Sequence, residues 1–104
     1  MHKALRALDW ERVGAEAVEL FRDLLRFDTT NPPGNEKACA EFLEKYLQDA
    51  GIETELLFSA PERANLIARI PGKGQGGALL LNAHLDVVPA EAEHWDMPPF
   101  EAEI

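Results

Sequence analysis

His84 and Asp86 stand two positions apart, just after the apolar run Ala78–Leu81. Four apolar residues are too few for a helix but fit a strand that is buried on both faces. If this strand continues through Asp86, alternation of side chains places Asn82, His84 and Asp86 on one face. Open α/β sheets bind their ligands at the carboxyl ends of strands. The spacing therefore predicts an imidazole and a carboxylate side by side at a ligand-binding edge.

The chemistry suited to this pair is metal binding. A neutral imidazole is a common zinc ligand, and a nearby carboxylate can hold its other nitrogen, fix the tautomer and raise its basicity. A histidine at a strand end can equally be a half-buried residue with a backbone partner. Spacing alone leaves both interpretations open.

Two amphipathic helices precede this pair. Asp9 can cap the first, which spans 10–25 and places Trp10 and Phe21 on a stripe that we expect to enter the core. Asn35 can cap the second, and Gly51 can end it in the left-handed conformation. The lone cysteine, Cys39, lies on the apolar side of the second helix, so we interpret it as core packing and not as a nucleophile or ligand.

The loop 28–34 between these helices must be irregular, because Pro32 and Pro33 cannot continue a helix. Thr29, Thr30 and Asn31 could contact a substrate, but residues of these types also form turns and caps. We favour the turn and cap interpretation.

Residues 52–58 and 65–70 have the composition of strands, and the short loop between them requires antiparallel pairing if they are neighbours. Together with the strand expected after Ala78, they predict an α/β fold with a mixed sheet flanked by helices. Gly72, Gly74 and Gly77 match the dinucleotide spacing G-x-G-x-x-G. That motif requires a following helix, and a strand is expected there, so we predict a surface loop.

Nineteen acidic against ten basic residues give a net charge of −9. Nucleic acids and anionic membranes bind clustered Lys and Arg, so neither is an expected partner. No apolar stretch approaches the length of a membrane span. We expect a cytoplasmic protein.

Three groups of residues occur in an order that is more specific than His-x-Asp alone: Phe27–Glu36, His84–Pro89, and Trp95 with Pro99 and Phe100. Together they resemble the co-catalytic zinc amidohydrolases and exopeptidases. That family includes acetylornithine deacetylase, succinyl-diaminopimelate desuccinylase, aminoacylase-1 and glutamate carboxypeptidase. The resemblance implies that residues 1–104 are the amino-terminal portion of a zinc-exopeptidase-like catalytic domain, incomplete without the rest of that domain and a second domain.

The resemblance also implies roles for the pair. His84 would bind one of two zinc ions, for which cobalt or manganese can substitute, and Asp86 would hold the His84 imidazole. The remaining ligands and a catalytic glutamate would follow Ile104. His94, the other histidine nearby, sits in an acidic loop where we expect a surface position.

The implied function is hydrolysis of an amide bond in N-acyl amino acids or short peptides, with small-molecule or short-peptide substrates. The full-length protein could form a homo-oligomer, and the 104-residue chain alone is expected to be inactive. The alternative is a non-catalytic α/β binding module that retains the scaffold.

Overall fold

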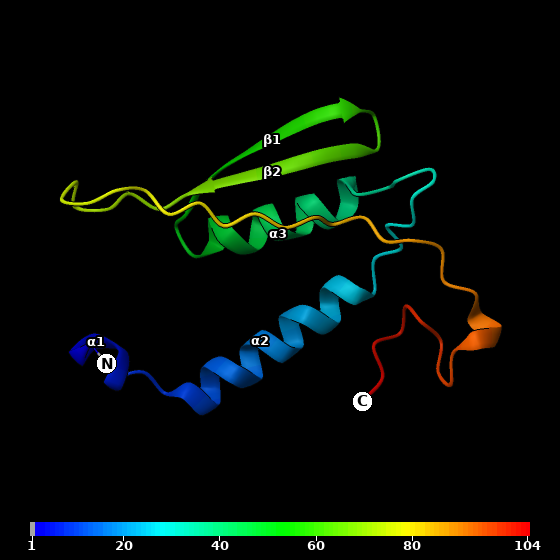
Figure 1. The fold of residues 1–104 in the computed structure, drawn as a ribbon, viewed down its shortest axis with the longest axis horizontal. Helices are drawn as coiled ribbons and strands as arrows, with labels where there is room; N and C mark the ends of the chain where they lie inside the picture. Colours follow the sequence, from blue (N-terminus) through cyan, green and yellow to red (C-terminus); the bar gives the residue numbers. More distant parts are fainter. Residues whose placement is uncertain (1) are drawn as a thin grey trace. The chain divides into compact units, whose positions relative to one another are not determined.

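The computed structural model describes residues 2–104, which divide into two units. One unit contains residues 2–27 and 91–104, and the other contains residues 28–90. The elements follow the chain in the order α1 (Lys3–Arg6), α2 (Trp10–Leu25), α3 (Lys37–Asp49), β1 (Glu53–Ala60), β2 (Arg63–Arg69) and the 3-10 helix η1 (Ala92–His94) (Figure 1). Among the described residues, no helix is both long and apolar enough to cross a membrane.

Helix α2 begins as the sequence predicts. Asp9 Oδ1 accepts a hydrogen bond from the backbone N–H of Arg12 at 3.1 Å, which satisfies a free donor of the first turn. The expectation that its apolar stripe enters the core is wrong. Trp10 and Phe21 are 52% and 60% exposed, and no residue of α2 is buried. An amphipathic pattern predicts the helix, but burial also needs a partner surface, which residues 91–104 of the same unit supply only in part.

The second unit is built on the predicted antiparallel hairpin. β1 pairs with β2 along their length, with Leu56 opposite Leu66 and a bulge between Phe58 and Ala60 (Figure 1). Helix α3 packs against both strands. The backbone N–H of Lys37, at the start of α3, donates to the Glu62 carbonyl in the hairpin turn at 3.0 Å. The turn of the hairpin is therefore fixed to the first turn of the helix.

The expected cap at the start of α3 is wrong, whereas the expected glycine at its end is confirmed. Asn35 does not cap the helix: Glu36 occupies the cap position and makes no capping bond with its side chain. Gly51 does end it, with φ of 77°. The N–H groups of Gly51 and Ile52 donate to the carbonyls of Gln48 and Leu47, which is a Schellman motif.

The buried apolar residues of the described chain lie where α3 meets the hairpin: Cys39, Ala40 and Ala64. Cys39 is 3% exposed, as its place on the apolar stripe predicts. Burial raises the pKa of its thiol, because the thiolate would lose its hydration. Cys39 is therefore a protonated packing residue at neutral pH.

The strand expected after Ala78 does not form, and the mixed sheet is wrong. The sheet has two strands, β1 and β2, both antiparallel. Residues 78–86 run without ladder partners, and Leu79, Leu80 and Leu81 are 84–86% exposed. One residue further on, Val87 makes a single isolated parallel bridge to Thr30. An apolar run indicates that a segment tends to form a strand. A strand forms only when a second strand lies beside it and accepts and donates its backbone hydrogen bonds.

The glycine-rich segment before it is a loop, as predicted. Residues 78–86, directly after Gly77, form no helix, so the helix start that binds a pyrophosphate is lacking there.

An ion pair fixes the loop that leads into α3. Glu36 accepts two hydrogen bonds from the Arg63 guanidinium, at 3.2 Å to Nε and 2.8 Å to Nη2. The Glu36 side chain is 7% exposed. Gly34 passes beside this pair with φ of 81°, and a Cβ there would lie 2.8 Å from Arg63 Nε. The site therefore requires glycine for both its conformation and its space.

We predict that acid destabilises the protein partly through Glu36. Hydrogen bonding to Arg63 holds the pKa of Glu36 below its ordinary value of 4.5. A carboxyl whose pKa is lowered on folding stabilises the protein above its unfolded pKa, and this contribution is lost as pH falls below 4.5 through the folded pKa. The Glu36→Gln variant should be less stable at neutral pH and should lose less stability on acidification, as measured by urea unfolding.

The control is Glu55→Gln, which changes an exposed glutamate of β1. A residual acid slope is expected in Glu36→Gln, because the pKa values of Asp28 and Asp86 are also lowered. Identical acid slopes for wild type and Glu36→Gln would contradict the role given to this pair.

Candidate functional site

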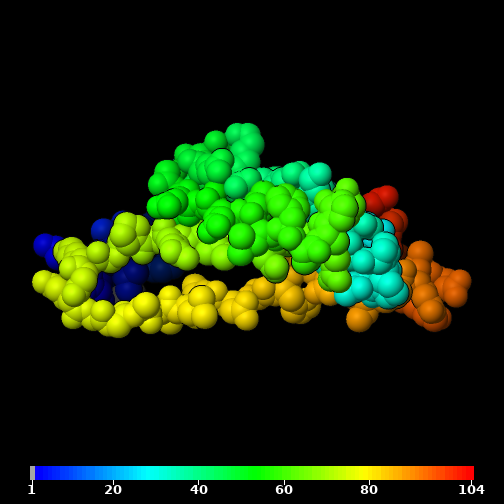
Figure 2. Space-filling view, turned by 90° about the horizontal axis from the view of Figure 1, so that it is seen from above, coloured from blue at the N-terminus to red at the C-terminus, as the bar shows by residue number. Residues whose placement is uncertain are grey.

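His84 and Asp86 lie on one wall of a groove of about 880 Å³ in the second unit. The extended segment 82–86 forms this wall, and β2 residues 64–67 form the opposite one, with Leu43 of α3 also lining the groove. Figure 2 shows the extended segment running alongside the hairpin, with an open gap between them. The pair that the sequence singled out is therefore accessible from a hollow of the surface.

The contact between the two side chains is present. His84 Nδ1 lies 2.8 Å from the Asp86 carbonyl oxygen and 3.2 Å from Asp86 Oδ1. Both partners are acceptors, so a neutral His84 ring that makes these contacts carries its proton on Nδ1. The Nε2 lone pair is then left for another ligand, and the His84 side chain is 84% exposed.

A second residue holds the Asp86 carboxylate. Asn31 Nδ2 donates to Asp86 Oδ2 at 2.9 Å. This hydrogen bond is the main reason that the pKa of Asp86 lies below its ordinary value, and the His84 contact adds to it, while partial burial opposes both. Asp86 is therefore an anion at neutral pH that faces His84 with one oxygen and Asn31 with the other.

The loop that supplies Asn31 is bonded to the site segment by three further hydrogen bonds. Thr29 Oγ1 donates to the Leu85 carbonyl at 2.7 Å, and Thr29 is 3% exposed. The Val87 N–H donates to the Thr29 carbonyl at 3.1 Å, and the Asn31 N–H donates to the Val87 carbonyl at 2.8 Å. These bonds fix the backbone on both sides of Asp86.

The interpretation of this loop as turn chemistry is right for Thr30 alone. Its N–H and hydroxyl both donate to Asp28 Oδ1, which is a local turn. Thr29 and Asn31 instead make hydrogen bonds to Leu85, Asp86 and Val87, which sequence reasoning missed. The polar residues in front of two prolines indicated that this loop could bond to another segment. The sequence could not identify that segment, because the partners lie about 55 residues further along the chain.

The Glu36–Arg63 ion pair also belongs to this groove. Glu36 and Arg63 both line it. The pKa of Arg63 is raised mainly by its hydrogen bonds to Glu36, with a smaller effect of the Asp86 charge. The guanidinium charge is largely matched by Glu36, so Asp86 remains available to His84.

Among the groove residues, His84 is suited to form one bond to a zinc ion. His84 offers an accessible imidazole with its other nitrogen held by a carboxylate residue, which is the arrangement seen around zinc-bound histidines. Catalytic zinc normally takes three protein ligands. Residues 2–104 assemble no group of three potential ligands that includes His84.

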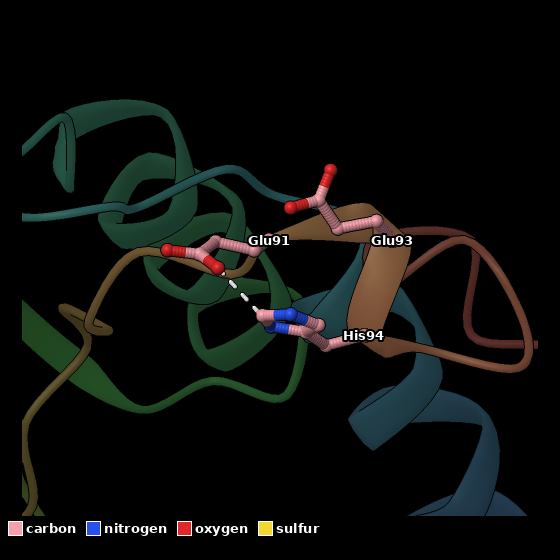
Figure 3. Close-up of side chains that lie close together, drawn as sticks. All are labelled: Glu91, Glu93 and His94. Carbon is pink, nitrogen blue, oxygen red and sulfur yellow. Dashed lines mark ion pairs between the residues drawn. The ribbon is translucent and has the colours of Figure 1, made fainter.

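The described residues do contain one such group, in the other unit. Glu91, Glu93 and His94 offer ligand atoms within 4.8 Å of one another, and all three are exposed (Figure 3). His94 Nδ1 pairs with Glu91 Oε2 at 3.1 Å. The surface position predicted for His94 is confirmed. Exposed acidic groups commonly gather without an ion, so this cluster does not define a metal site.

The chain is similar in sequence to part of several known amidohydrolases. It is 36% identical over 87 residues to aminoacylase-1 of Homo sapiens, and 33% identical over 88 residues to acetylornithine deacetylase of Vibrio atlanticus. It is 30% identical over 93 residues to an N-formyl-4-amino-5-aminomethyl-2-methylpyrimidine deformylase of Halalkalibacterium halodurans. These alignments cover 79–86% of this chain. No family model matches it.

The chain is therefore homologous to a segment of the zinc amidohydrolase family, as the motifs indicated. It spans 21–22% of the length of these relatives.

We predict that Thr29→Val loosens the site segment. Valine keeps the shape but leaves the part-buried Leu85 carbonyl without this donor, which costs about 0.5 to 1.5 kcal/mol of unfolding free energy. Urea unfolding gives the stability, and hydrogen exchange at residues 84–87 gives the local effect. Thr30→Val is the matched control, since its hydroxyl bonds only Asp28. Equal effects of the two variants would contradict the long-range role of Thr29.

Proposed function

We propose that this chain is part of a zinc-dependent hydrolase that cleaves an amide bond in N-acyl amino acids or short peptides. The observation that carries the proposal is the His84–Asp86 contact, in which His84 Nδ1 is held and the rest of the ring is exposed in a groove. The homology supports it, because the relatives include an acylase, a deacetylase and a deformylase.

In this proposal each residue has a defined task. His84 binds a zinc ion through Nε2, and Asp86 fixes the imidazole and raises its basicity. Zinc, when bound, lowers the pKa of water and polarises a carbonyl. The complete enzyme binds two zinc ions, and cobalt or manganese can replace zinc. The other ligands and the general base come from outside residues 1–104.

The wider setting belongs to the same proposal. The partners are a small-molecule or short-peptide substrate, without nucleic acid or membrane, and the whole protein can form a homo-oligomer. The net charge of −9 supports the exclusion of polyanions as partners, since they require clustered basic residues. The proposed compartment is the cytoplasm.

We predict that zinc binds the 104-residue chain weakly and at His84. Titration with zinc should shift the ring resonances of His84 in nuclear magnetic resonance spectra, and His84→Ala should abolish this response. Asp86→Asn keeps the shape but removes the charge, and loss of such a partner lowers metal affinity about 10- to 100-fold.

His94→Ala is the matched control, because it removes the histidine of the exposed acidic cluster and leaves the groove intact. If zinc instead shifted only His94, the assignment of His84 as the ligand would fail. An Asp86→Asn variant that bound zinc as tightly as wild type would remove Asp86 from its proposed task.

We predict that the 104-residue chain by itself does not turn over substrate. One histidine ligand cannot hold a catalytic zinc ion that needs three. The assay uses acetylated amino acids and dipeptides with added zinc or cobalt. Turnover that disappears with a chelator would overturn this prediction. A chain that bound such substrates without any metal response would favour the non-catalytic binding module instead.

A further inference from the structure

The Asp86 carboxylate is held from two sides in the structure. Oδ2 accepts from Asn31 Nδ2 at 2.9 Å, and Oδ1 lies 3.2 Å from His84 Nδ1. Because the carboxylate is planar, a bond that fixes one oxygen also fixes the direction of the other. The Asp86 side chain is 33% exposed, so most of it is shielded from water.

Asn31 is itself held in place relative to Asp86. Its backbone N–H donates to the Val87 carbonyl at 2.8 Å, one residue beyond Asp86. The Val87 N–H donates back to the Thr29 carbonyl at 3.1 Å. The backbone of Asn31 is therefore hydrogen-bonded to the backbone next to Asp86. The side-chain amide then loses little further conformational entropy when it bonds the carboxylate.

The chemistry of an amide suits this task. Asn31 donates a hydrogen bond without bringing a charge, so the full negative charge of Asp86 remains directed at His84. A carboxylate at the same place would repel Asp86, and an ammonium would compete with His84 for its charge.

We propose that Asn31 is a positioning residue, which sets the rotamer of Asp86 and so places Oδ1 as the second acceptor for His84 Nδ1. The first acceptor is the Asp86 carbonyl oxygen at 2.8 Å, and the carboxylate at 3.2 Å adds the charge and narrows the orientation of the imidazole. The consequence for zinc binding rests on the proposed function, whereas the orientation of Asp86 and His84 does not. Asn31 touches neither a metal nor a substrate in this role. It acts indirectly, through the Asp86 carboxylate.

The test measures side-chain conformation in the 104-residue chain. Three-bond couplings of the Asp86 β-protons report its rotamer, and nitrogen shifts of the His84 ring, recorded at one fixed pH for all samples, report its tautomer. In Asn31→Ala, the ratio of the dominant Asp86 rotamer to the others should fall about threefold or more, because one charge-assisted bond is lost. Asn31→Asp should have a larger effect, since it adds repulsion while keeping the shape.

Asn82→Ala is the matched control, because Asn82 is an exposed asparagine that lines the same groove. It should leave the Asp86 couplings and the His84 shifts unchanged. Amide spectra establish that each variant is folded, and the isosteric Asn31→Asp variant keeps the test valid if Asn31→Ala unfolds. Unchanged Asp86 couplings in a folded Asn31 variant, or equal changes in Asn82→Ala, would overturn the proposal.

Zinc titration of the same samples separates the two proposals. If the Asn31 variants change the Asp86 rotamer but wild-type His84 does not respond to zinc, the proposed function fails and the positioning role stands. If wild-type His84 responds to zinc and the Asn31 variants keep both rotamer and affinity, the positioning role fails and the metal assignment stands. Weaker zinc binding together with altered rotamers supports both.

Discussion

The site depends on the hydrogen bonds that join the loop 29–31 to the segment 85–87. Residues 78–86 have no ladder partner of their own, so their position is not set by a sheet. The bonds of Thr29 and Asn31 to Leu85, Asp86 and Val87 supply that constraint. A histidine and a carboxylate on a free extended segment would sample many orientations, and these bonds reduce them to one.

The loop 29–31 is itself fixed by other residues of the second unit. Gly34 allows the chain to turn beside Arg63, and the Glu36–Arg63 pair joins the start of α3 to the start of β2. The Schellman motif at Gly51 then returns the chain into β1. Glu36 is buried while the Arg63 side chain is 40% exposed, so removing the arginine would leave a buried carboxylate without its partner. The pair therefore specifies the geometry of the loop.

The homology and the geometry support the proposed function in different ways. The relatives indicate the class of reaction, but this chain spans only 21–22% of their length. The geometry concerns one imidazole and the carboxylate beside it, and their assignment to a metal site is part of the proposal. Function in this chain is thus argued from a single ligand and the residues that hold it.

Features that depend on residues close together in the chain could be predicted from the amino-acid sequence. These include helix α2 with its Asp9 cap, the end of α3 at Gly51, the antiparallel hairpin and the proximity of His84 to Asp86. Only the tertiary structure decided that 78–86 has no strand partner, that the α2 stripe is exposed and that Asn31 reaches Asp86. Periodicity and capping act within a turn or two of the chain. Strand pairing, burial and a hydrogen bond between residues 55 positions apart depend on which distant surfaces meet, and no local pattern specifies that.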